Sequence, residues 1–171
     1  MAGSLIKIDE EIVSSAVASV TLTGIDSTYD VYKFVGNNIT PSTDDVSLFG
    51  RITKGGSADT TSNYDSAYKN FYAPGSFSNS ADTNDSSINF GNNGTGTSES
   101  HQIILYLFNF ANSSEFSFLT REHLRVGADQ NLFGQQGGIV HTVASASDGL
   151  HFYQASGNIA SGTFTLYGLK K

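Results

Sequence analysis

The sequence of 171 residues contains no cysteine and only two prolines, Pro41 and Pro74. Without cysteine, a disulfide framework, a thiolate metal site and a thiol nucleophile are all excluded. The fold must therefore rest on packing and hydrogen bonds. A single domain of this size can do so, because it buries roughly 70% of its unfolded surface. We expect one domain over residues 1–171.

Charged residues are also few. Charged residues make up 15% of the chain, compared with about 25% in an ordinary soluble domain. Their balance is negative, with a formal net charge of −7, so the chain lacks a basic face that could replace the counterions on phosphates. We therefore expect no nucleic-acid partner.

Long hydrophobic runs are missing as well. The longest run, residues 103–108, is far shorter than the roughly 20 residues that span a bilayer. Residues 1–11 do not contain the basic segment and long apolar stretch of a secretory signal. We expect no membrane insertion and a protein that is made and kept in a cytoplasm.

What the sequence does have is apolar and polar residues that alternate in short segments, separated by Gly, Asn, Asp and Ser, which is typical of strands. The predicted strands are residues 5–8, 16–23, 31–35, 46–53, 64–71, 87–90, 102–110, 115–119, 139–143, 150–153 and 161–169. The segment 113–126 is interpreted as a strand that continues into an irregular turn. Two polar stretches, 55–63 and 73–100, are predicted to be long loops, which are uncommon unless they bind something.

The alternation also predicts which side chains are buried. Phe164 and Leu166 should line one apolar face of a half-buried strand, and Val20 and Leu22 should do the same. Residues 103–110 are apolar on both faces, so this strand is central and covered on both sides, or its second face meets another subunit. These features predict an all-β, two-sheet antiparallel sandwich, jelly-roll-like, with long polar loops. An Ig-like or lectin-type sandwich would produce the same pattern.

Two histidines invite a test for a metal site. A hairpin centred on residues 145–147 would place His141 opposite His151, whereas a turn at Asp148 and Gly149 would separate them. A third ligand at metal spacing is missing. The segment 82–87 carries alternate oxygen side chains like a calcium loop, but it has no glycine at the sharp turn and no glutamate at the twelfth position. We expect no metal site.

Catalytic patterns are equally weak. The acidic runs 9–11 and 44–45 hold sequence neighbours, which point to opposite faces of a strand rather than across a cleft. No serine lies in a Gly-x-Ser-x-Gly motif. The glycine-rich segment 134–138 lacks the lysine and helix of a phosphate-binding loop, and we interpret it as a loop where chain meets chain. We predict no catalytic, cofactor-binding or metal-binding residue, no cofactor and no enzymatic activity.

Aromatic residues are the strongest feature that remains without a role. Tyr29, Tyr32, Tyr64, Tyr68 and Tyr72 are concentrated in the first half of the chain. Exposed tyrosines can stack on sugars or anchor protein interfaces, so host glycans are possible ligands. The alternative is that these side chains line the core, with their hydroxyl groups at its edge.

The C-terminal stretch resembles a known kind of protein ending. In residues 148–170, an aromatic strand containing Phe152 leads through Ser156, Gly157 and Asn158 to Gly-Thr-Phe-Thr-Leu-Tyr-Gly at 162–168. This order resembles the ending of small structural proteins in tailed bacteriophage particles. Residues 4–9 and 19–24 resemble the start of virion proteins from phages of marine bacteria, including cyanobacteria. The middle, about 55–100, carries no such resemblance.

This resemblance implies a jelly-roll-like virion component without enzymatic activity. The function we expect is that of a capsid decoration, or cement, protein on the phage head exterior, which bridges major capsid subunits. Its expected partners are the major capsid protein and copies of itself, with a trimer as the first guess for the homo-oligomer. The alternative is a tail or head fibre component, or a receptor-binding knob that recognises host surface glycans.

Overall fold

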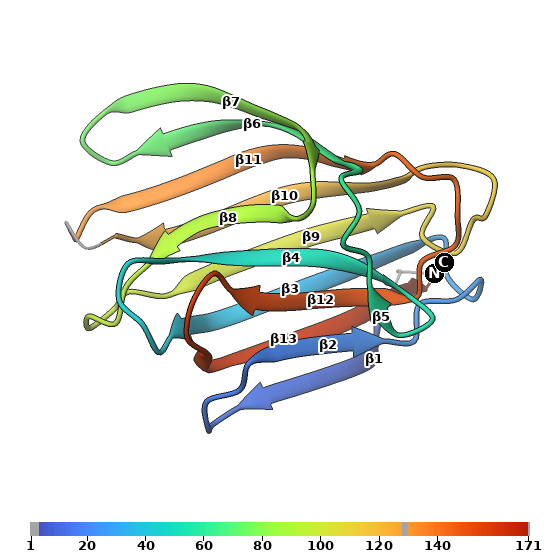
Figure 1. The fold of residues 1–171 in the computed structure, drawn as a ribbon, viewed down its shortest axis with the longest axis horizontal. Coiled ribbons are helices and arrows are strands. Elements are labelled where there is room, and N and C mark those ends of the chain that lie inside the picture. Colours follow the sequence, from blue (N-terminus) through green and yellow to red (C-terminus); the bar gives the residue numbers. More distant parts are fainter. Residues whose placement is uncertain (1–3, 128–129, 171) are drawn as a thin grey trace.

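The computed structural model describes residues 4–127 and 130–170, which form two antiparallel sheets packed face to face (Figure 1). The larger sheet has eight strands in the order β1-β13-β3-β9-β10-β11-β6-β7, and the smaller has the order β2-β12-β4-β5, with β8 also paired to β4. The strands are β1 (Ser4–Val13), β2 (Ser19–Thr23), β3 (Val31–Pro41), β4 (Val46–Lys54), β5 (Ser57–Ala58), β6 (Tyr64–Tyr72), β7 (Ser76–Asp85), β8 (Ile88–Asn93), β9 (His101–Phe108), β10 (Ser117–Val126), β11 (Leu132–His141), β12 (Gly149–Gln154) and β13 (Ile159–Lys170). The predicted all-β antiparallel sandwich is confirmed.

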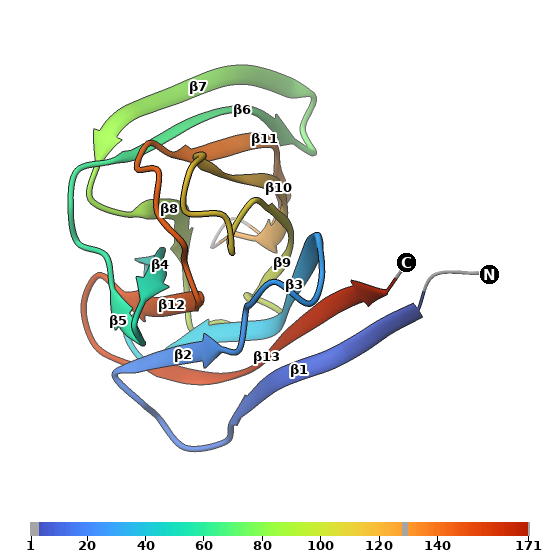
Figure 2. The same cartoon turned by 90° about the vertical axis from the view of Figure 1, so that its right-hand side faces the viewer.

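The order of the strands shows that the chain crosses repeatedly between the two sheets. The chain passes from one sheet to the other between β1 and β2, between β3 and β4, and between β12 and β13. Two hairpins, β6–β7 and β10–β11, extend the larger sheet beyond β9. Figure 2 looks along the strands and shows this larger sheet curving around the smaller one. One face of the larger sheet is therefore covered, and its other face points outward.

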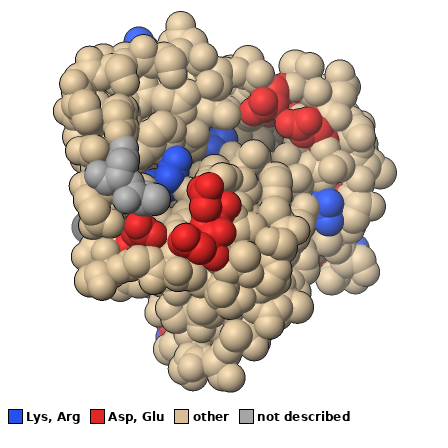
Figure 3. All heavy atoms as spheres, turned by 60° about the vertical axis from the view of Figure 1, so that its left-hand side comes forward, with Lys and Arg blue, Asp and Glu red and all other residues tan. Residues whose placement is uncertain are grey.

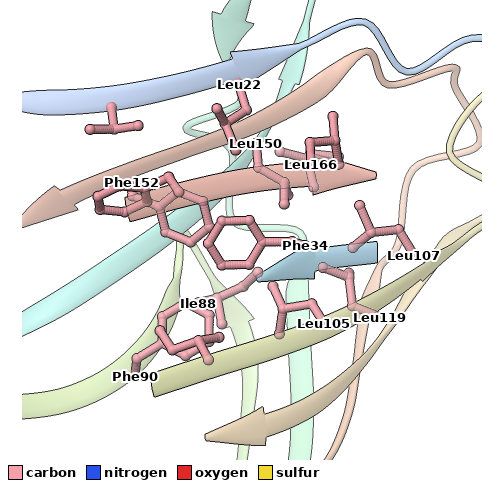
Figure 4. Packing of buried hydrophobic residues seen from close by; sticks show 14 of the residues in the cluster. Leu22, Phe34, Ile88, Phe90, Leu105, Leu107, Leu119, Leu150, Phe152 and Leu166 are labelled. Atoms are coloured by element: carbon pink, nitrogen blue, oxygen red, sulfur yellow. The ribbon is translucent and has the colours of Figure 1, made fainter. Parts of the chain in front are cut away.

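The hydrophobic core lies between the two sheets. The alternation in β13 puts Phe164 and Leu166 inside, and Val20 and Leu22 of β2 are buried as predicted. Phe34 of β3 stacks on Phe152 of β12 across the sandwich, with ring centroids 4.5 Å apart (Figure 4). Burying each such ring stabilises the fold by roughly 1.5–3 kcal/mol.

The structure corrects the predicted loop at 73–100, because two strands, β7 and β8, lie within it. Strand β7 shows no alternation of apolar and polar residues, and its one large apolar side chain, Phe77, is 72% exposed, since this is the edge strand of the larger sheet and little covers it. Its backbone pairs with β6 over the register from Tyr72↔Ser76 to Tyr64↔Asp85. Backbone pairing thus makes a strand here without an apolar pattern in the sequence.

The interpretation of residues 113–126 was partly wrong as well, because β10 continues as a regular strand as far as Val126.

The glycine-rich segment 134–138 is also not a loop, since it lies inside β11. A Cβ atom at Gly137 would come within 2.3 Å of the carbonyl oxygen of Ala67, so glycine lets β11 and β6 approach at this point. At Gly138, on the opposite face, the nearest atom to such a Cβ would be 4.0 Å away. On the side of the sheet that Gly138 faces, the absence of a side chain therefore leaves a shallow depression in the surface.

Candidate interaction surface

We call the outward side of the larger sheet its outer face. It consists of the side chains that alternate with the buried ones on five neighbouring strands. They are Val31, Lys33 and Val35 of β3; Ile104, Tyr106 and Phe108 of β9; Phe118, Thr120, Glu122 and Leu124 of β10; Leu132, Gly134, Gln136, Gly138 and Val140 of β11; and Asp65, Ala67, Lys69 and Phe71 of β6. Most of these residues are apolar or very small.

Several large apolar side chains on the outer face are open to solvent. The exposed fraction is 46% for Phe118, 43% for Leu124, 44% for Leu132 and 37% for Phe108. Single exposed apolar residues are normal, but a contiguous patch on a soluble domain marks an interaction site. The outer face is therefore the strongest candidate for a functional surface.

Strand β9 is not covered on both sides. It is central, being fourth in the larger sheet, and its inward residues Ile103, Leu105 and Leu107 are buried. Its outward residues Ile104 and Tyr106 are only half-buried, and Phe108 is exposed. The described part of the chain therefore leaves this second, apolar face of β9 partly open.

A groove of 440 Å³ crosses the outer face. Its floor includes Ala67, Gly138 and Thr120, and Phe108 and Phe118 stand beside it. The Thr120 hydroxyl accepts a hydrogen bond from the Tyr106 backbone N–H at 3.1 Å, which holds Thr120 in the sheet. The groove is open and mostly lined by carbon, so it suits an inserted apolar side chain better than a polar substrate.

The inner side of β10 offers a contrasting candidate, a buried chain of polar groups. His101 Nδ1 lies 2.6 Å from His123 Nε2, and His123 Nδ1 lies 3.2 Å from Gln135 Oε1. Arg121 Nη2 donates to the same Gln135 oxygen and to the Asn89 carbonyl oxygen. Because Gln135 Oε1 can only accept, the proton of His123 is on Nδ1 and that of His101 is on its own Nδ1. Both rings are neutral in this arrangement.

Burial fixes that neutral state. It lowers the pKa of His101 well below its usual value, with His123 and the nearby arginines adding to the effect. It also lowers the pKa of His123 to about 3. Arg121 lies between the rings of Tyr68 and Phe90, at 4.1 and 5.2 Å from their centroids. His101, His123, Arg121 and Gln135 are buried in the sandwich, with at most 6% of each residue exposed.

The hairpin that would pair His141 with His151 does not form, because β11 and β12 belong to different sheets. His141 instead lies against the Tyr64 ring and 3.3 Å from the Asp59 carboxylate. His151 is 2.8 Å from the Thr21 hydroxyl on β2. The histidines that do come together, His101 and His123, are diagonal neighbours on β9 and β10. Only the register between β9 and β10 could have predicted that His101 and His123 lie together.

The carboxylates singled out in the sequence have structural partners. Asp82 accepts hydrogen bonds from Ser66 and Tyr68, and Asp9 accepts one from the Thr23 backbone N–H. Asp44 and Asp45 bind Thr95 and Asn92 of the β8–β9 region. Among residues 4–127 and 130–170, no three His, Cys, Asp or Glu side chains are grouped so that they could hold a metal ion.

The tyrosines divide between core and partly covered positions. Tyr32 and Tyr64 are buried, and their hydroxyl groups donate to the carbonyl oxygens of Asp26 and Asp59 at the edge of the core. Tyr29, Tyr68 and Tyr72 are half-buried. The first two therefore follow the core interpretation rather than that of exposed glycan-binding side chains.

Figure 3 shows the side of the molecule that lies to the left in Figure 1. Most of the surface seen there is uncharged, and small groups of acidic side chains lie near basic ones.

As for membrane spans, the described part of the chain holds no helix with the length and apolar character to cross a bilayer.

The chain matches no protein-family model, no curated protein and no solved structure.

Proposed function

We propose that the protein is a non-enzymatic structural component of a tailed-phage virion, a capsid decoration protein that binds the head exterior and bridges major capsid subunits. The observation that carries this proposal is the outer face, where apolar side chains of five strands lie side by side without convergent catalytic groups. Such a surface suits attachment to protein. The phage setting comes from the resemblance of residues 4–9, 19–24 and 148–170 to virion proteins.

Repetition makes a modest surface sufficient for this role. A decoration protein is present in many copies, so weak contacts that are repeated over a shell give strong overall attachment. The low fraction of charged residues, 15%, also limits the desolvation that each contact requires. Neither consideration calls for a deep pocket or a cofactor.

The test is made on purified particles. We expect particles that lack the protein to lose their DNA at lower temperature and under milder osmotic shock than complete particles. A particle lacking it that is equally resistant would contradict the cement role. Copy number locates the protein, since hundreds of copies indicate the head exterior, whereas a multiple of six or twelve near the tail would indicate the fibre or receptor-binding role instead.

A matched pair of variants ties the role to the surface. We expect Phe118→Ser on the outer face to weaken retention on particles during gradient purification. Val17→Ser, which changes a similarly exposed apolar residue on the β1–β2 connection, should be retained like the wild-type protein. Equal retention of both variants would show that the outer face has no part in attachment, either by direct contact or by holding copies of the protein together.

A further inference from the structure

We infer that the outer face binds a second copy of this chain, in a two-fold dimer whose axis runs along β11. This inference deepens the proposed function, on whose premise of an assembly surface it rests, because it names the partner of that surface. The two copies contact each other through the same residues, as an isologous interface requires.

The edges of the larger sheet are poorer sites for pairing than its face. Strand β1 has a register shift between Lys7 and Asp9, and Glu10 and Glu11 add negative charge beside it. Strand β7 at the other edge is mostly polar, with Asp82 and Asp85 in its second half and Phe77 as its one large apolar side chain. Bulges and charges of this kind block edge-to-edge pairing.

The charge of the outer face favours a copy of the same chain. Its charged residues are Lys33, Lys69, Asp65 and Glu122, two of each sign, so the net charge of the face is zero. The whole chain carries −7. Two copies that meet through this face therefore avoid the repulsion that two other faces would experience.

The positions of these charges point to a particular arrangement. Glu122, Gln136 and Lys69 are direct cross-strand neighbours on β10, β11 and β6, so β11 lies midway between two opposite charges. Rotation by half a turn about an axis along β11 brings Glu122 of each copy opposite Lys69 of the other. Sheets that pack face to face lie about 10 Å apart, a gap that a glutamate and a lysine side chain can bridge together.

The neighbouring rows fit the same rotation. Leu124, Gly134 and Phe71 form a row on one side, in which the apolar ends would meet each other. On the other side, Thr120, Gly138 and Ala67 form a row of small residues, which would leave a gap between the copies.

Phe118 lies in the next row, together with Val140 and Asp65. It stands beside the groove of 440 Å³ that the small row lines. The rotation places the Phe118 ring of each copy opposite Asp65 of the other copy and next to the gap, so the ring covers the gap from its edge.

The size of the contact predicts its strength. Rotation about an axis along β11 overlaps the five strands from β9 to β7 of the two copies. Five strands about 4.8 Å apart, over nine residues of about 3.3 Å each, present roughly 700 Å² per copy. The total of about 1,400 Å² is in the lower half of the range for specific interfaces. We therefore expect a dissociation constant in the micromolar range. Because the outer face is covered in the dimer, each copy would contact the shell through another of its surfaces, and two such contacts raise the overall affinity.

Charge exchange tests the arrangement. Glu122 and Lys69 are exposed, so neither substitution should disturb folding. In sedimentation velocity, Glu122→Lys and Lys69→Glu should each raise the dimer dissociation constant about 10-fold, because like charges then face each other twice per dimer. The double variant carrying both changes should return to within about 3-fold of wild type. A double variant no tighter than the single ones would overturn the two-fold arrangement.

A second pair of variants tests the occupant itself. Phe118→Ser should abolish self-association, and Val17→Ser should leave it unchanged. A wild-type protein that stays monomeric at millimolar concentration would overturn the inference, as would a trimer that charge exchange does not affect. Particle retention is measured separately. If the wild-type protein is monomeric and Phe118→Ser is still lost from particles, the proposed function stands and the dimer is rejected. If the protein forms the dimer but particles without it are as resistant as complete ones, the dimer stands and the proposed function is rejected.

Discussion

The two sides of β10 carry side chains of similar size, but those on one side are buried and those on the other are exposed. Leu119, Arg121 and His123 point inward and are at most 2% exposed, while Phe118 and Leu124 point outward and are more than 40% exposed. The inner side is covered by the smaller sheet, which makes even an arginine and a histidine part of the interior. The outer side has an apolar surface that residues 4–127 and 130–170 leave largely open. The type of a residue alone thus does not decide whether it is buried. We propose that the outer side is the surface through which the protein assembles.

The largest expected effect concerns the inner side and acid. His101 and His123 have pKa values held below their usual value by burial, so the folded protein binds fewer protons than the unfolded chain below about pH 6.5. Stability is therefore complete above that pH and falls as the pH decreases toward the folded pKa values. By pH 4.5, the loss in unfolding free energy for the pair is up to about 5 kcal/mol.

Urea unfolding at pH 7.5 and pH 4.5 measures this loss. The double variant His101→Asn, His123→Asn should show a much smaller difference between the two pH values, whatever its own stability. If the difference is as large in the variant as in the wild type, the acid sensitivity comes from other groups.

The next effect is the removal of a core side chain. Leu119→Ala deletes a side chain that is 2% exposed on the inner side of β10. We expect the unfolding free energy to fall by about 2–5 kcal/mol, since both transfer and cavity terms are lost. Urea unfolding near neutral pH checks this value, and a loss under about 1 kcal/mol would mean that the inner side is less well covered than described.

Two adjacent glycines of β11 give a smaller effect with opposite signs. Gly137→Ala places a methyl group 2.3 Å from the Ala67 carbonyl oxygen, and we expect a loss of about 1–3 kcal/mol. Gly138→Ala on the outer face meets nothing closer than 4.0 Å and should stabilise the fold by about 0.5–1 kcal/mol. Thermal unfolding of both variants tests this, and equal losses would contradict the difference between the two sides.

The smallest effect on stability is expected on the outer side of β10. Phe118→Ala should change the unfolding free energy of the monomer by no more than about 0.5 kcal/mol, because the ring is already largely hydrated. Urea unfolding at protein concentrations too low for dimer formation measures this change in free energy. A loss comparable to that of Leu119→Ala would place Phe118 in the core rather than on an interaction surface.

Alternation in the sequence was sufficient to predict the strands whose one face is buried, such as β2 and β13, and β9 was predicted from its continuous apolar run. It failed for β7, whose residues are mostly polar and whose one large apolar side chain, Phe77, is exposed because the strand lies at an edge. It failed again for β11, where glycines remove the side chains that would reveal the period. In both cases the pairing partners, which lie elsewhere in the chain, determine the structure.

The candidate surface was only half visible in the sequence. The apolar second face of residues 103–110 pointed to it, with another subunit as one of two explanations. The contributions of β11 and β6 could not be predicted, because Gly138 and Ala67 become neighbours only through the register of the sheet. The buried pair of His101 and His123 depends in the same way on the register between β9 and β10.

The absence of cysteine makes the most direct test of the outer face possible. Gln136→Cys would introduce a single thiol beside the proposed axis, and Ser14→Cys would introduce one on the exposed β1–β2 connection as a control. The rate of maleimide labelling is then measured over a range of protein concentrations. We predict that labelling slows at position 136, and not at position 14, as the concentration passes the micromolar range. A labelling rate at position 136 that is independent of concentration would contradict the assignment of the outer face to self-assembly.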